Sequence, residues 1–406
     1  MLDLKYIREN LKEVQKNLEK RGAKVDLDKL LEFSGKKKDL QSQIELLRFE
    51  QKKLTGKNDR AVKIKQMLKD LEPQLQEIAE NLKTEAVKMP NILQDDVPEG
   101  KDETQNVVLR EVGEINPPAG EKKDPDHIEI GKALDLIDID RAVKVSGNRF
   151  YFLKNQAVEL EFALVKYVID LVKAENFQPI LPPILIKEEM AWGSGHFEAI
   201  NDDAYHMKND PLVAIGTSEQ SILPYFAGEV IEKLPQRFLG FSTCLRREAG
   251  SYGKDVKGIL RAHQFDKLEM FSFCQRENSK KEHELIVSLE EKIMAGLSLP
   301  YRIVALCAGD LSLPSAKTID LETWMPGEGR YRETHSSSNC TDFQARRLKI
   351  RYKDGDKLDF VHTLNGTAVA IGRVLIAILE NYFQEDGSVK VPEVLQKYCG
   401  FKEIKK

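Results

Sequence analysis

The sequence predicts an α+β protein with two parts: an antiparallel helical hairpin near the N-terminus and a larger domain built on a mainly antiparallel sheet. Two heptad stretches separated by turn residues lie between positions 33 and 89. From about residue 128 onwards, short β-like runs and helical segments follow one another in irregular order. Strands that rarely alternate one-to-one with helices favour an antiparallel sheet over a doubly wound parallel one. With 406 residues, the chain is long enough to form both parts.

The N-terminal part begins with a short amphipathic helix over residues 1–22, which ends at Gly22. Two longer apolar seams with alternating spacings of four and three residues follow it. The first carries Phe33, Leu40, Ile44, Leu47 and Leu54, and the second carries Ala61, Ile64, Leu68, Leu71, Leu75, Ile78, Leu82 and Met89. Turn residues occupy positions 55–59 between them, so we predict that the two helices fold back on each other as a coiled-coil arm. Helices of ~30 residues would make the arm ~40 Å long.

The composition is typical of a soluble globular protein, with 41% hydrophobic and 32% charged residues. No apolar run is long enough to span a bilayer, and the N-terminal segment lacks the layout of a signal peptide. The five cysteines form no CxxC pair, which favours a reducing compartment over a disulfide framework or a cysteine-built zinc site. We therefore expect a cytoplasmic protein with no membrane partner.

The formal net charge of −4 conceals an uneven distribution along the chain. Between Gly35 and Lys69, eleven Lys or Arg residues stand against four Asp or Glu residues, a net of +7, so the remainder carries −11. A basic segment on an acidic body indicates a region that meets a polyanion. The alternative is an ordinary solvated surface of the coiled coil.

Beyond the arm, Pro90 ends the second helix, and the Pro-, Gly- and acid-rich residues 90–127 predict a linker or irregular surface segment. We expect helices at 155–175, 218–233, 279–297 and 368–383. We expect strands at 177–186, 237–246, 259–273, 301–308, 318–324 and 358–364. Neither a GxGxxG nor a GxxxxGK[ST] phosphate loop occurs, so any use of ATP requires another architecture.

The segment 241–271 is interpreted as strand, loop, strand, and it carries the densest set of candidate site residues. Alternation of side chains places Arg246 and Glu248 on one face of the first strand, and Phe265, Lys267 and Glu269 on one face of the second. Here an arginine could neutralise a phosphate or carboxylate, Phe265 could stack a base, and Glu269 could hold an ammonium. From the pattern alone, cross-strand ion pairing on a solvated sheet face explains the charges equally well.

The segment 364–381 predicts a largely apolar helix in which Arg373 is the only charge between Gly366 and Leu379. Burying an unpaired guanidinium is costly, so Arg373 needs an anionic partner or opens into a cavity. Asn365-Gly366-Thr367 at the predicted helix start is typical of a ligand-binding segment. A purely structural pair with an Asp or Glu elsewhere remains the alternative for Arg373.

Two shorter runs carry weaker signals. Residues 330–339 combine an acid, an imidazole and hydroxyls, and Glu333 with Ser336 offers hard oxygen ligands for Mg²⁺, although most such runs are solvated loops. Residues 215–219 end a predicted strand and begin a helix, with Thr217 as a natural N-cap and Glu219 near the positive helix end. A plain helix cap is the alternative for this second run.

Taken together and in this order, the segments closely resemble bacterial-type seryl-tRNA synthetases, which are class II aminoacyl-tRNA synthetases. The resemblance covers nearly the whole chain, and three residues depart from the usual pattern: Leu245, Ser218 and His335. It implies a class II antiparallel β-sheet core flanked by helices over residues 106–406. It also implies a tRNA-binding domain over residues 1–105, with the coiled-coil arm at about 26–89. The most specific runs are GTSE (216–219), RREAGSYGKD (246–255), HQFDKLE (263–269), DFQARR (342–347) and LNGTA (364–368).

The resemblance implies serine–tRNA ligase chemistry, in which ATP and L-serine form seryl-adenylate and the seryl group then passes to tRNA(Ser). Charging of tRNA(Sec) is left open. Catalysis is assigned to Arg246 and Arg373. The residues implied to bind ATP are Arg246, Glu248, Ala262, Phe265, Glu333, Thr334, His335, Ser336 and Arg373. Those implied to bind serine are Thr217, Ser218, Glu219, Arg246, Glu269 and Thr367.

The resemblance also implies a metal ion and two macromolecular contacts. Glu333 and Ser336 would hold Mg²⁺ together with ATP. The arm would bind tRNA, and residues 167–183 would form a homodimer. Three other classes of protein compete with this interpretation: an amino-acid:carrier-protein ligase, a non-catalytic nucleic-acid-binding scaffold, and an inert coiled-coil interaction protein. The arm counts against a carrier-protein ligase, because such ligases resemble synthetases that lack it. The candidate site keeps its charged residues, which counts against a non-catalytic scaffold. A mixed domain of about 300 residues would be unexplained in an inert coiled-coil protein.

Overall fold

The computed structural model describes residues 2–54, 59–115, 125–196, 203–249 and 257–406. Within these residues the chain forms two compact units, one up to Ile92 and one from Leu93 onwards. Most of the turn predicted at 55–59, and residues 250–255 of the predicted hairpin loop, lie outside the described residues.

The first unit is helical and consists of α1 (Leu4–Glu9), α2 (Leu11–Lys20), α3 (Leu27–Lys53) and α4 (Asp59–Ala86). The single helix expected over residues 1–22 is therefore two helices, because the backbone of Asn10 leaves the helical conformation between them. Two helices begin at aspartate caps. The Asp3 carboxylate accepts a hydrogen bond from the Lys5 N–H, and Asp26 accepts one from Lys29.

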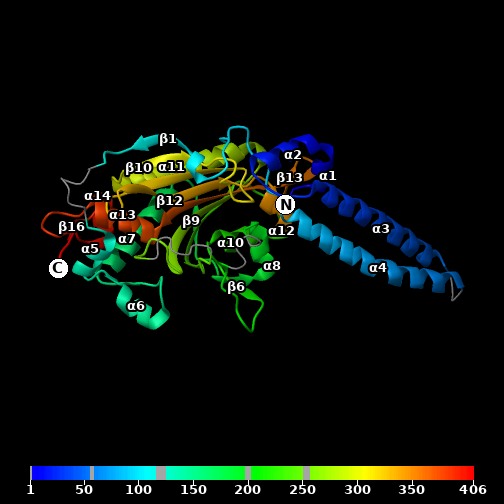
Figure 1. Ribbon diagram of the computed structural model, residues 1–406, viewed down its shortest axis with the longest axis horizontal. Helices are drawn as coiled ribbons and strands as arrows, with labels where there is room; N and C mark the ends of the chain where they lie inside the picture. Colours follow the sequence, from blue (N-terminus) through cyan, green and yellow to red (C-terminus); the bar gives the residue numbers. More distant parts are fainter. Residues whose placement is uncertain (1, 55–58, 116–124, 197–202, 250–256) are drawn as a thin grey trace. The chain divides into compact units, whose positions relative to one another are not determined.

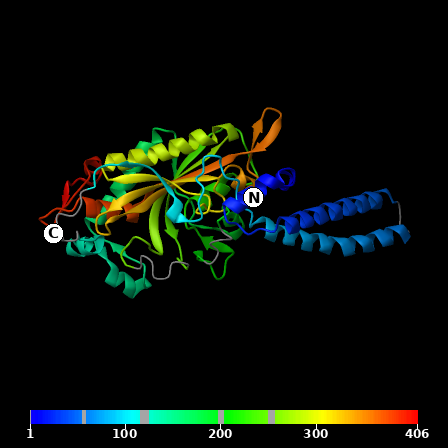
Figure 2. The ribbon, with the colours of Figure 1, turned by 45° about the horizontal axis from the view of Figure 1, so that its top comes forward.

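Helices α3 and α4 run side by side in opposite directions and form the predicted arm (Figures 1 and 2). Residues of both heptad seams meet between them. The buried contacts are Ile44 and Leu47 from α3 and Ile64 and Leu68 from α4. Each such aliphatic side chain stabilises the pairing by about 1.5–3 kcal/mol relative to exposure. The coiled-coil prediction is confirmed.

The second unit is built on an eight-stranded sheet with the strand order β1-β10-β11-β12-β15-β9-β8-β4. Every neighbouring pair is antiparallel except β4 and β8, so the predicted mainly antiparallel α+β core is confirmed. The strands are β1 (Val107–Val112), β4 (Gln178–Ile180), β8 (Gln236–Leu245), β9 (Gln264–Cys274), β10 (Tyr301–Ala305), β11 (Lys317–Met325), β12 (Arg330–Asn339) and β15 (His362–Ala370).

Short strands form smaller sheets around this core. The pairs are β2 (Ile137–Asp138) with β3 (Phe152–Leu153), β5 (Leu185–Lys187) with β6 (Leu212–Ala214), and β16 (Val389–Lys390) with β17 (Glu403–Ile404). Strand β13 (Arg351–Asp354) lies between β7 (Val230–Ile231) and β14 (Lys357–Phe360).

Two predicted segments are wrong. The linker expected over 90–127 contains β1, which is the edge strand beside β10. The helix expected over 218–233 stops after one turn, since α10 covers only Glu219–Ile222. A 3₁₀ turn, Leu223–Phe226, follows it, and Pro224 in that turn has no N–H with which to continue an α-helix.

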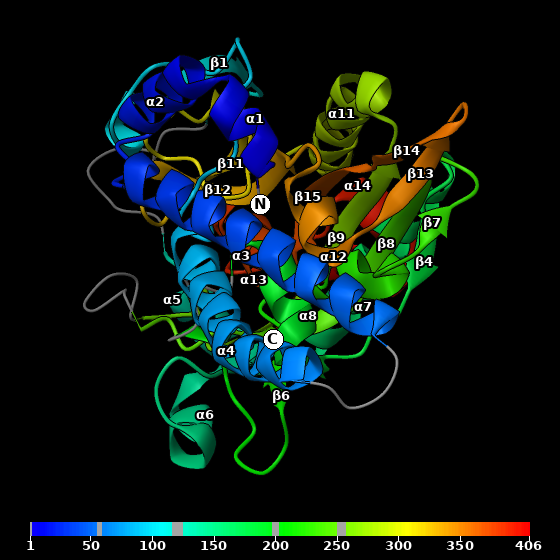
Figure 3. The ribbon, with the colours of Figure 1, turned by 90° about the vertical axis from the view of Figure 1, so that its right-hand side faces the viewer.

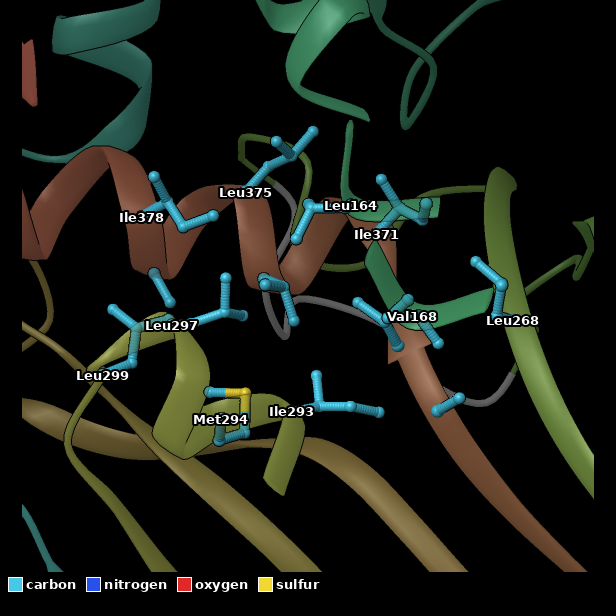
Figure 4. Close-up of a cluster of buried hydrophobic side chains, with 14 of the residues drawn as sticks. Leu164, Val168, Leu268, Ile293, Met294, Leu297, Leu299, Ile371, Leu375 and Ile378 are labelled. Atoms are coloured by element: carbon cyan, nitrogen blue, oxygen red, sulfur yellow. The ribbon is translucent and has the colours of Figure 1, made fainter. Parts of the chain in front are cut away.

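Three helices cover one face of the large sheet: α7 (Gln156–Lys173), α11 (Ser279–Leu297) and α13 (Ile371–Asn381). Helix α14 (Glu393–Cys399) packs against α7 and α11. Figure 4 shows side chains of α7, α11 and α13 meeting in one cluster, with Leu164 and Val168 of α7, Ile293 of α11, Ile371 of α13 and Leu268 of β9. Helix α11 lies alongside the sheet in both Figure 2 and Figure 3. One face of the sheet is therefore covered by apolar side chains and excluded from solvent.

The other short helices are α5 (His127–Ala133), α6 (Ile139–Ser146), α8 (Glu188–Ala191) and α12 (Phe343–Leu348). Helices α8, α10 and α12 lie next to one another with the 3₁₀ turn Trp192–Ser194. Across the described residues, no helix combines the length and apolar character that crossing a membrane requires.

Candidate active site

The hairpin of β8 and β9 supplies the centre of the candidate site. Along β9, Leu268 and Met270 point into the apolar core, whereas Lys267 and Glu269 lie on the other face and line a cleft. This sidedness follows from the two-residue period of a strand, because the core can accept only every second side chain. Phe265 continues the row and lines a smaller cavity that adjoins the cleft.

The cleft has a volume of about 1050 Å³ and the adjoining cavity about 70 Å³. Both are formed within the second unit. The side chains shared by the two mark the junction between them, and nearly all of these side chains are charged. They are Arg246, Glu248, Arg261, Lys267, Glu333, Thr367 and Arg373.

Arg246 follows directly after β8 and is held from both sides. Its backbone N–H donates to the carbonyl of His263 at 2.9 Å, which extends the hairpin pairing beyond the strands. Its Nε donates to the Gly216 carbonyl at 3.1 Å, and its guanidinium carbon lies 5.3 Å from the centre of the Phe265 ring. The terminal nitrogens are thereby aimed at the junction, where they can meet an anion.

Glu248 does not share a strand face with Arg246, contrary to the prediction from strand alternation. Strand β8 ends at Leu245, and Glu248 has a φ of 52°, in the left-handed region. Its carboxylate is paired with Arg261, whose Nη1 lies 3.0 Å from Glu248 Oε2. The left-handed turn redirects the side chain, so both residues still line the junction.

Glu219 is one of two buried carboxylates in the cleft, and only 4% of it is exposed. The Gln344 amide donates to its Oε1 at 2.6 Å, and His196 Nε2 lies 3.8 Å from the same atom. Burial raises the pKa of Glu219, partly offset by the Gln344 hydrogen bond and by the charges of Lys267 and Arg246. Because its 2.6 Å hydrogen bond comes from a neutral amide, this buried carboxylate is suited to receive a cationic ligand group.

Gly240 explains how the segment containing Glu219 comes so close to the sheet. This glycine is paired with Glu269 across β8 and β9. A Cβ atom at Gly240 would lie 2.6 Å from Ile222 Cδ1 and 2.7 Å from Ser218 Oγ. Only glycine therefore lets α10 approach and bring Glu219 near Glu269.

Glu269 is the second buried carboxylate, with 2% of its surface exposed. Its Oε2 lies 2.6 Å from Lys267 Nζ and accepts a hydrogen bond of 3.3 Å from Thr367 Oγ1 on β15. Burial raises its pKa, Lys267 acts in the opposite direction, and Glu219 adds to the rise. The hydroxyl of Thr367 and the carboxylate of Glu269 form one polar surface.

Arg373 on α13 is paired with Glu333 on β12, with Nη1 at 3.0 Å from Glu333 Oε1 and 2.8 Å from the Glu333 carbonyl oxygen. The sequence left an anionic partner and an opening into a cavity as alternatives for Arg373, and the structure has both, because Arg373 pairs with Glu333 and also lines the junction. Its side chain remains 24% exposed, so it can also bind a ligand.

Oxygen atoms suited to a hard cation gather beside Glu333. Asp320 on β11 is directly opposite Ser336 on β12, and all three line the cleft. The Oδ1 atom of Asp320 is buried and has no hydrogen-bond partner within the described residues. Burial raises the pKa of Asp320, and the nearby Glu333 adds to the effect. No group of three or more His, Cys, Asp or Glu side chains arranged for a metal occurs in the described part of the chain.

Two of the remaining predicted site residues, Ser218 and His335, lie away from the cavities, and three others line them. Ser218 is fully buried, donates to the Gly240 carbonyl at 3.4 Å and lines neither cavity. His335 is also fully buried, burial lowers its pKa to about 3, and it lines neither cavity. Ala262 and Thr334 line the smaller cavity, and Thr217 lines the cleft.

Two local assignments need correction. The N-cap of α10 is Ser218, not Thr217, although Thr217 Oγ1 accepts a 3.4 Å hydrogen bond from the Glu219 N–H. Asn365-Gly366-Thr367 does not start a helix, since β15 continues to Ala370 and α13 begins at Ile371. Pairing with β9 and β12 overrides the helical pattern of this segment and places Thr367 opposite Glu269.

Three residues of the site received no role from the sequence. Lys267 was detectable, because alternation already put it on the Glu269 face. Asp320 alternates with buried residues on β11, which is a weak signal. Gln344 lies in the DFQARR run, but nothing local indicated its role, since its contact with Glu219 joins positions 125 residues apart.

The comparisons with known proteins agree along the whole chain. Residues 1–93 match the family described as the seryl-tRNA synthetase N-terminal domain, and residues 204–382 match the tRNA synthetase class II core domain (G, H, P, S and T). A serine--tRNA ligase of Treponema denticola is 40% identical over 423 residues, with full coverage of both chains. One of Borreliella burgdorferi is 41% identical and covers 100% of this chain and 99% of its own.

Solved structures give the same result. A seryl-tRNA synthetase from Pyrococcus horikoshii complexed with ATP has a TM-score of 0.91 and 37% identity, covering 100% of this chain and 99% of its own. A cytoplasmic serine-tRNA ligase from Naegleria fowleri in complex with AMP has a TM-score of 0.88 and 31% identity at the same coverage. With its antiparallel core, its helical arm and full-length relatives above 30% identity, the chain belongs to the seryl-tRNA synthetase family.

Proposed function

We propose that the chain is a serine--tRNA ligase that carries out two steps in this cleft. In the first, the carboxylate of L-serine attacks the α-phosphorus of ATP, pyrophosphate leaves, and seryl-adenylate forms. In the second, a terminal ribose hydroxyl of tRNA(Ser) attacks the adenylate carbonyl and AMP leaves. The observation that carries this proposal is the pair of buried carboxylates, Glu219 and Glu269, beside a junction lined by Arg246 and Arg373.

The nucleotide is assigned to the smaller cavity. Phe265 and Arg373 both line it, and we assign to them the role of holding an adenine between an aromatic ring and a guanidinium plane. Ala262 and Glu248 line the same cavity and would contact the adenine side. The ATP and AMP held by two related structures support this assignment. His335 is assigned no direct contact with the nucleotide, because it is buried away from the cavity.

The amino acid is assigned to the deep part of the cleft. Thr217, Glu219 and Glu269 would receive the α-ammonium, and Glu269 with Thr367 would bond the side-chain hydroxyl. An amino acid without that hydroxyl would leave the Glu269–Thr367 surface unpaired in a dry site. Selectivity of ~10⁴-fold or more over alanine is therefore expected.

Neither step needs a protein nucleophile. Arg246 would bind both the α-phosphate and the serine carboxylate, so that the attacking oxygen and the phosphorus are held in line. The negative charge that grows on the phosphate oxygens is neutralised by Arg246 and Arg373, which are already in place before the reaction.

Glu333 and Ser336 are the residues proposed to hold Mg²⁺ together with the phosphates of ATP. The site fits such an ion, because the buried, unpartnered Oδ1 of Asp320 lies on the same side of the sheet within the described part of the chain. Two protein oxygens are enough for an ion that keeps water and phosphate ligands. When bound, the ion supplies charge neutralisation on the departing pyrophosphate.

The arm is proposed to bind tRNA(Ser) through the basic segment 35–69, chiefly by phosphate contacts.

We further propose a homodimer formed around α7 and β4, where Phe162 is 60% and Leu181 is 78% exposed in the single chain. A second copy of the chain would cover these side chains.

The five cysteines of the chain are free, which supports a reducing compartment, and we propose that the protein acts in the cytoplasm.

Pyrophosphate exchange across a panel of amino acids, without tRNA, tests the central proposal. We expect exchange with serine alone, and Glu269→Ala is expected to abolish it. Exchange with another amino acid, or near-wild-type exchange by Glu269→Ala, would overturn the assignment.

Deleting Phe33–Lys83 is expected to leave serine activation intact and to greatly reduce charging of tRNA. Transfer of serine to a carrier protein in place of tRNA would favour the carrier-protein ligase instead.

A further inference from the structure

Lys267 is a buried cation in the amino-acid part of the cleft, and it has no role in the two steps proposed so far. Only 7% of its surface is exposed, and its Nζ lies 2.6 Å from Glu269 Oε2. The two residues are neighbours on one face of β9, and both of their side chains are nearly inaccessible to solvent. A buried ion pair of this kind brings little net stability, so its presence points to another role.

The position of Lys267 connects the two cavities. Its side chain lines the cleft and also the smaller cavity assigned to the nucleotide. Its charge acts on Glu219 as well as Glu269, lowering the pKa of both carboxyls against the effect of burial. The Lys267 side chain therefore belongs to the wall that the cleft shares with the cavity assigned to the nucleotide.

We propose that Lys267 is the resident counter-ion of the amino-acid site, which the α-ammonium of serine displaces from Glu269 and which then turns toward the α-phosphate. This inference rests on the proposed function. In the empty site, Lys267 would keep Glu269 ionised. During adenylate formation, it would add a cation where negative charge develops on the α-phosphate.

The chemistry of the two groups favours such an exchange. In the single chain, Glu269 Oε2 already has the Lys267 ammonium and the Thr367 hydroxyl as partners. An incoming ammonium that bonds this oxygen must compete with the resident ammonium for its lone pairs, because Oε2 already accepts from Lys267 and Thr367. Lysine suits this role because its charge is compact and its four-carbon stem is flexible, unlike the planar fork of arginine.

Removing the charge of Lys267 should change how serine binding depends on pH. The groups that act on Glu269 are Lys267 on the same strand, Thr367 of β15, Glu219 of α10, Glu290 of α11 and Cys244 of β8. Of these, only Lys267 is a cation. Without it, the carboxyl stays protonated to a higher pH, and a protonated Glu269 cannot accept an ammonium.

The test compares wild type with Lys267→Met and Lys267→Gln in serine-dependent pyrophosphate exchange between pH 6 and 9. We expect the serine KM of both variants to rise by roughly tenfold or more at pH 7, since each unit of raised pKa lowers the ionised fraction tenfold. This KM should recover as the pH increases, with its midpoint at a higher pH than in wild type. The kcat should also fall, because the cation at the α-phosphate is lost.

Two further variants separate this role from a structural one. Lys267→Arg keeps the charge and should keep the wild-type midpoint of the serine KM profile while its kcat falls. Lys317→Met removes a different lysine–carboxylate pair, the one that Lys317 of β11 makes with Asp96 outside both cavities, and should leave the profile unchanged. Thermal unfolding of each variant shows whether the protein is folded.

Three outcomes would overturn the inference. An unshifted midpoint in Lys267→Met and Lys267→Gln would show that Lys267 does not control Glu269. A shifted midpoint with unchanged kcat would refute the movement toward the phosphate. A shift of equal size in Lys317→Met would show a general effect of charge. If the proposed function itself were wrong, the wild-type protein would show no serine-dependent exchange, which distinguishes that failure from a failure of the inference about Lys267.

Discussion

The Gln344 side chain donates a hydrogen bond from Nε2 to Glu219 Oε1 at 2.6 Å, and it cannot turn away. The same Nε2 donates to the Ser194 carbonyl at 2.9 Å, and Gln344 Oε1 accepts from Thr363 Oγ1 at 2.7 Å. Both amide donors and the acceptor therefore have fixed partners, and the residue is completely buried. Gln344 thus sets the direction of the Glu219 carboxylate.

Replacing Gln344 with Glu is expected to weaken serine binding. A second carboxylate 2.6 Å from Glu219 would favour protonation of one of the two, and an unpaired acceptor would remain. We expect the serine KM to rise by roughly ten- to a hundredfold, the factor that an unsatisfied buried group costs. The ATP KM, measured in the same exchange assay, is the internal control. An equal rise in both constants would contradict a role specific to Glu219.

Thr367→Val should reduce the discrimination between serine and alanine. Valine keeps the shape of threonine but removes the hydroxyl that donates to Glu269 at 3.3 Å. The ratio of kcat/KM for serine over alanine should fall by about tenfold or more, because part of the hydroxyl-reading surface is removed. Thr367→Ser keeps the hydroxyl and should keep most of the ratio. Equal ratios in wild type and Thr367→Val would exclude Thr367 from hydroxyl recognition.

Glu161→Gln should remove part of the pH dependence of stability. Burial raises the pKa of Glu161 from its ordinary value of 4.5 to about 8, and a hydrogen bond to Asp266 adds to the rise. Between these values the folded state holds a proton that the unfolded state releases, so stability falls as pH rises. The thermal midpoint of wild type should therefore drop relative to the variant between about pH 5 and 8.

The exposed Glu159 on the same helix provides the control for this experiment. Glu159→Gln should follow wild type across the whole pH range. A difference between wild type and Glu161→Gln that stays constant with pH would contradict the raised pKa.

Lysines of the arm should contribute to tRNA binding but not to serine activation. Lys38, Lys65 and Lys69 are exposed and make no ion pair within the described residues. Changing each to Ala should weaken tRNA binding and reduce the slope of log Kd against log salt by about one for each lysine that binds a phosphate. Serine-dependent pyrophosphate exchange should stay at the wild-type level. An unchanged salt slope in the triple variant would refute phosphate binding by these lysines.

The elements predicted well are those whose pattern is local and repeated. The heptad seams predicted the arm, and the helices expected at 155–175 and 279–297 are α7 (Gln156–Lys173) and α11 (Ser279–Leu297). Long helices with one apolar face bury that face whatever the remaining topology is. The wrong predictions, such as those for 218–233 and 365–367, concern segments where strand pairing or a proline overrides the local pattern.

For the site, the order of the amino acids was enough to place Lys267 and Glu269 on one face, because the two-residue period of a strand is a local property. It was also enough to predict that Arg373 has an anionic partner or opens into a cavity, because an unpaired guanidinium is too costly to bury. The folded arrangement was needed to identify that anion as Glu333, to show that Gln344 orients Glu219, and to place His335 away from the cavity. These contacts join distant positions of the chain, and their partners depend on how the strands of the sheet are ordered.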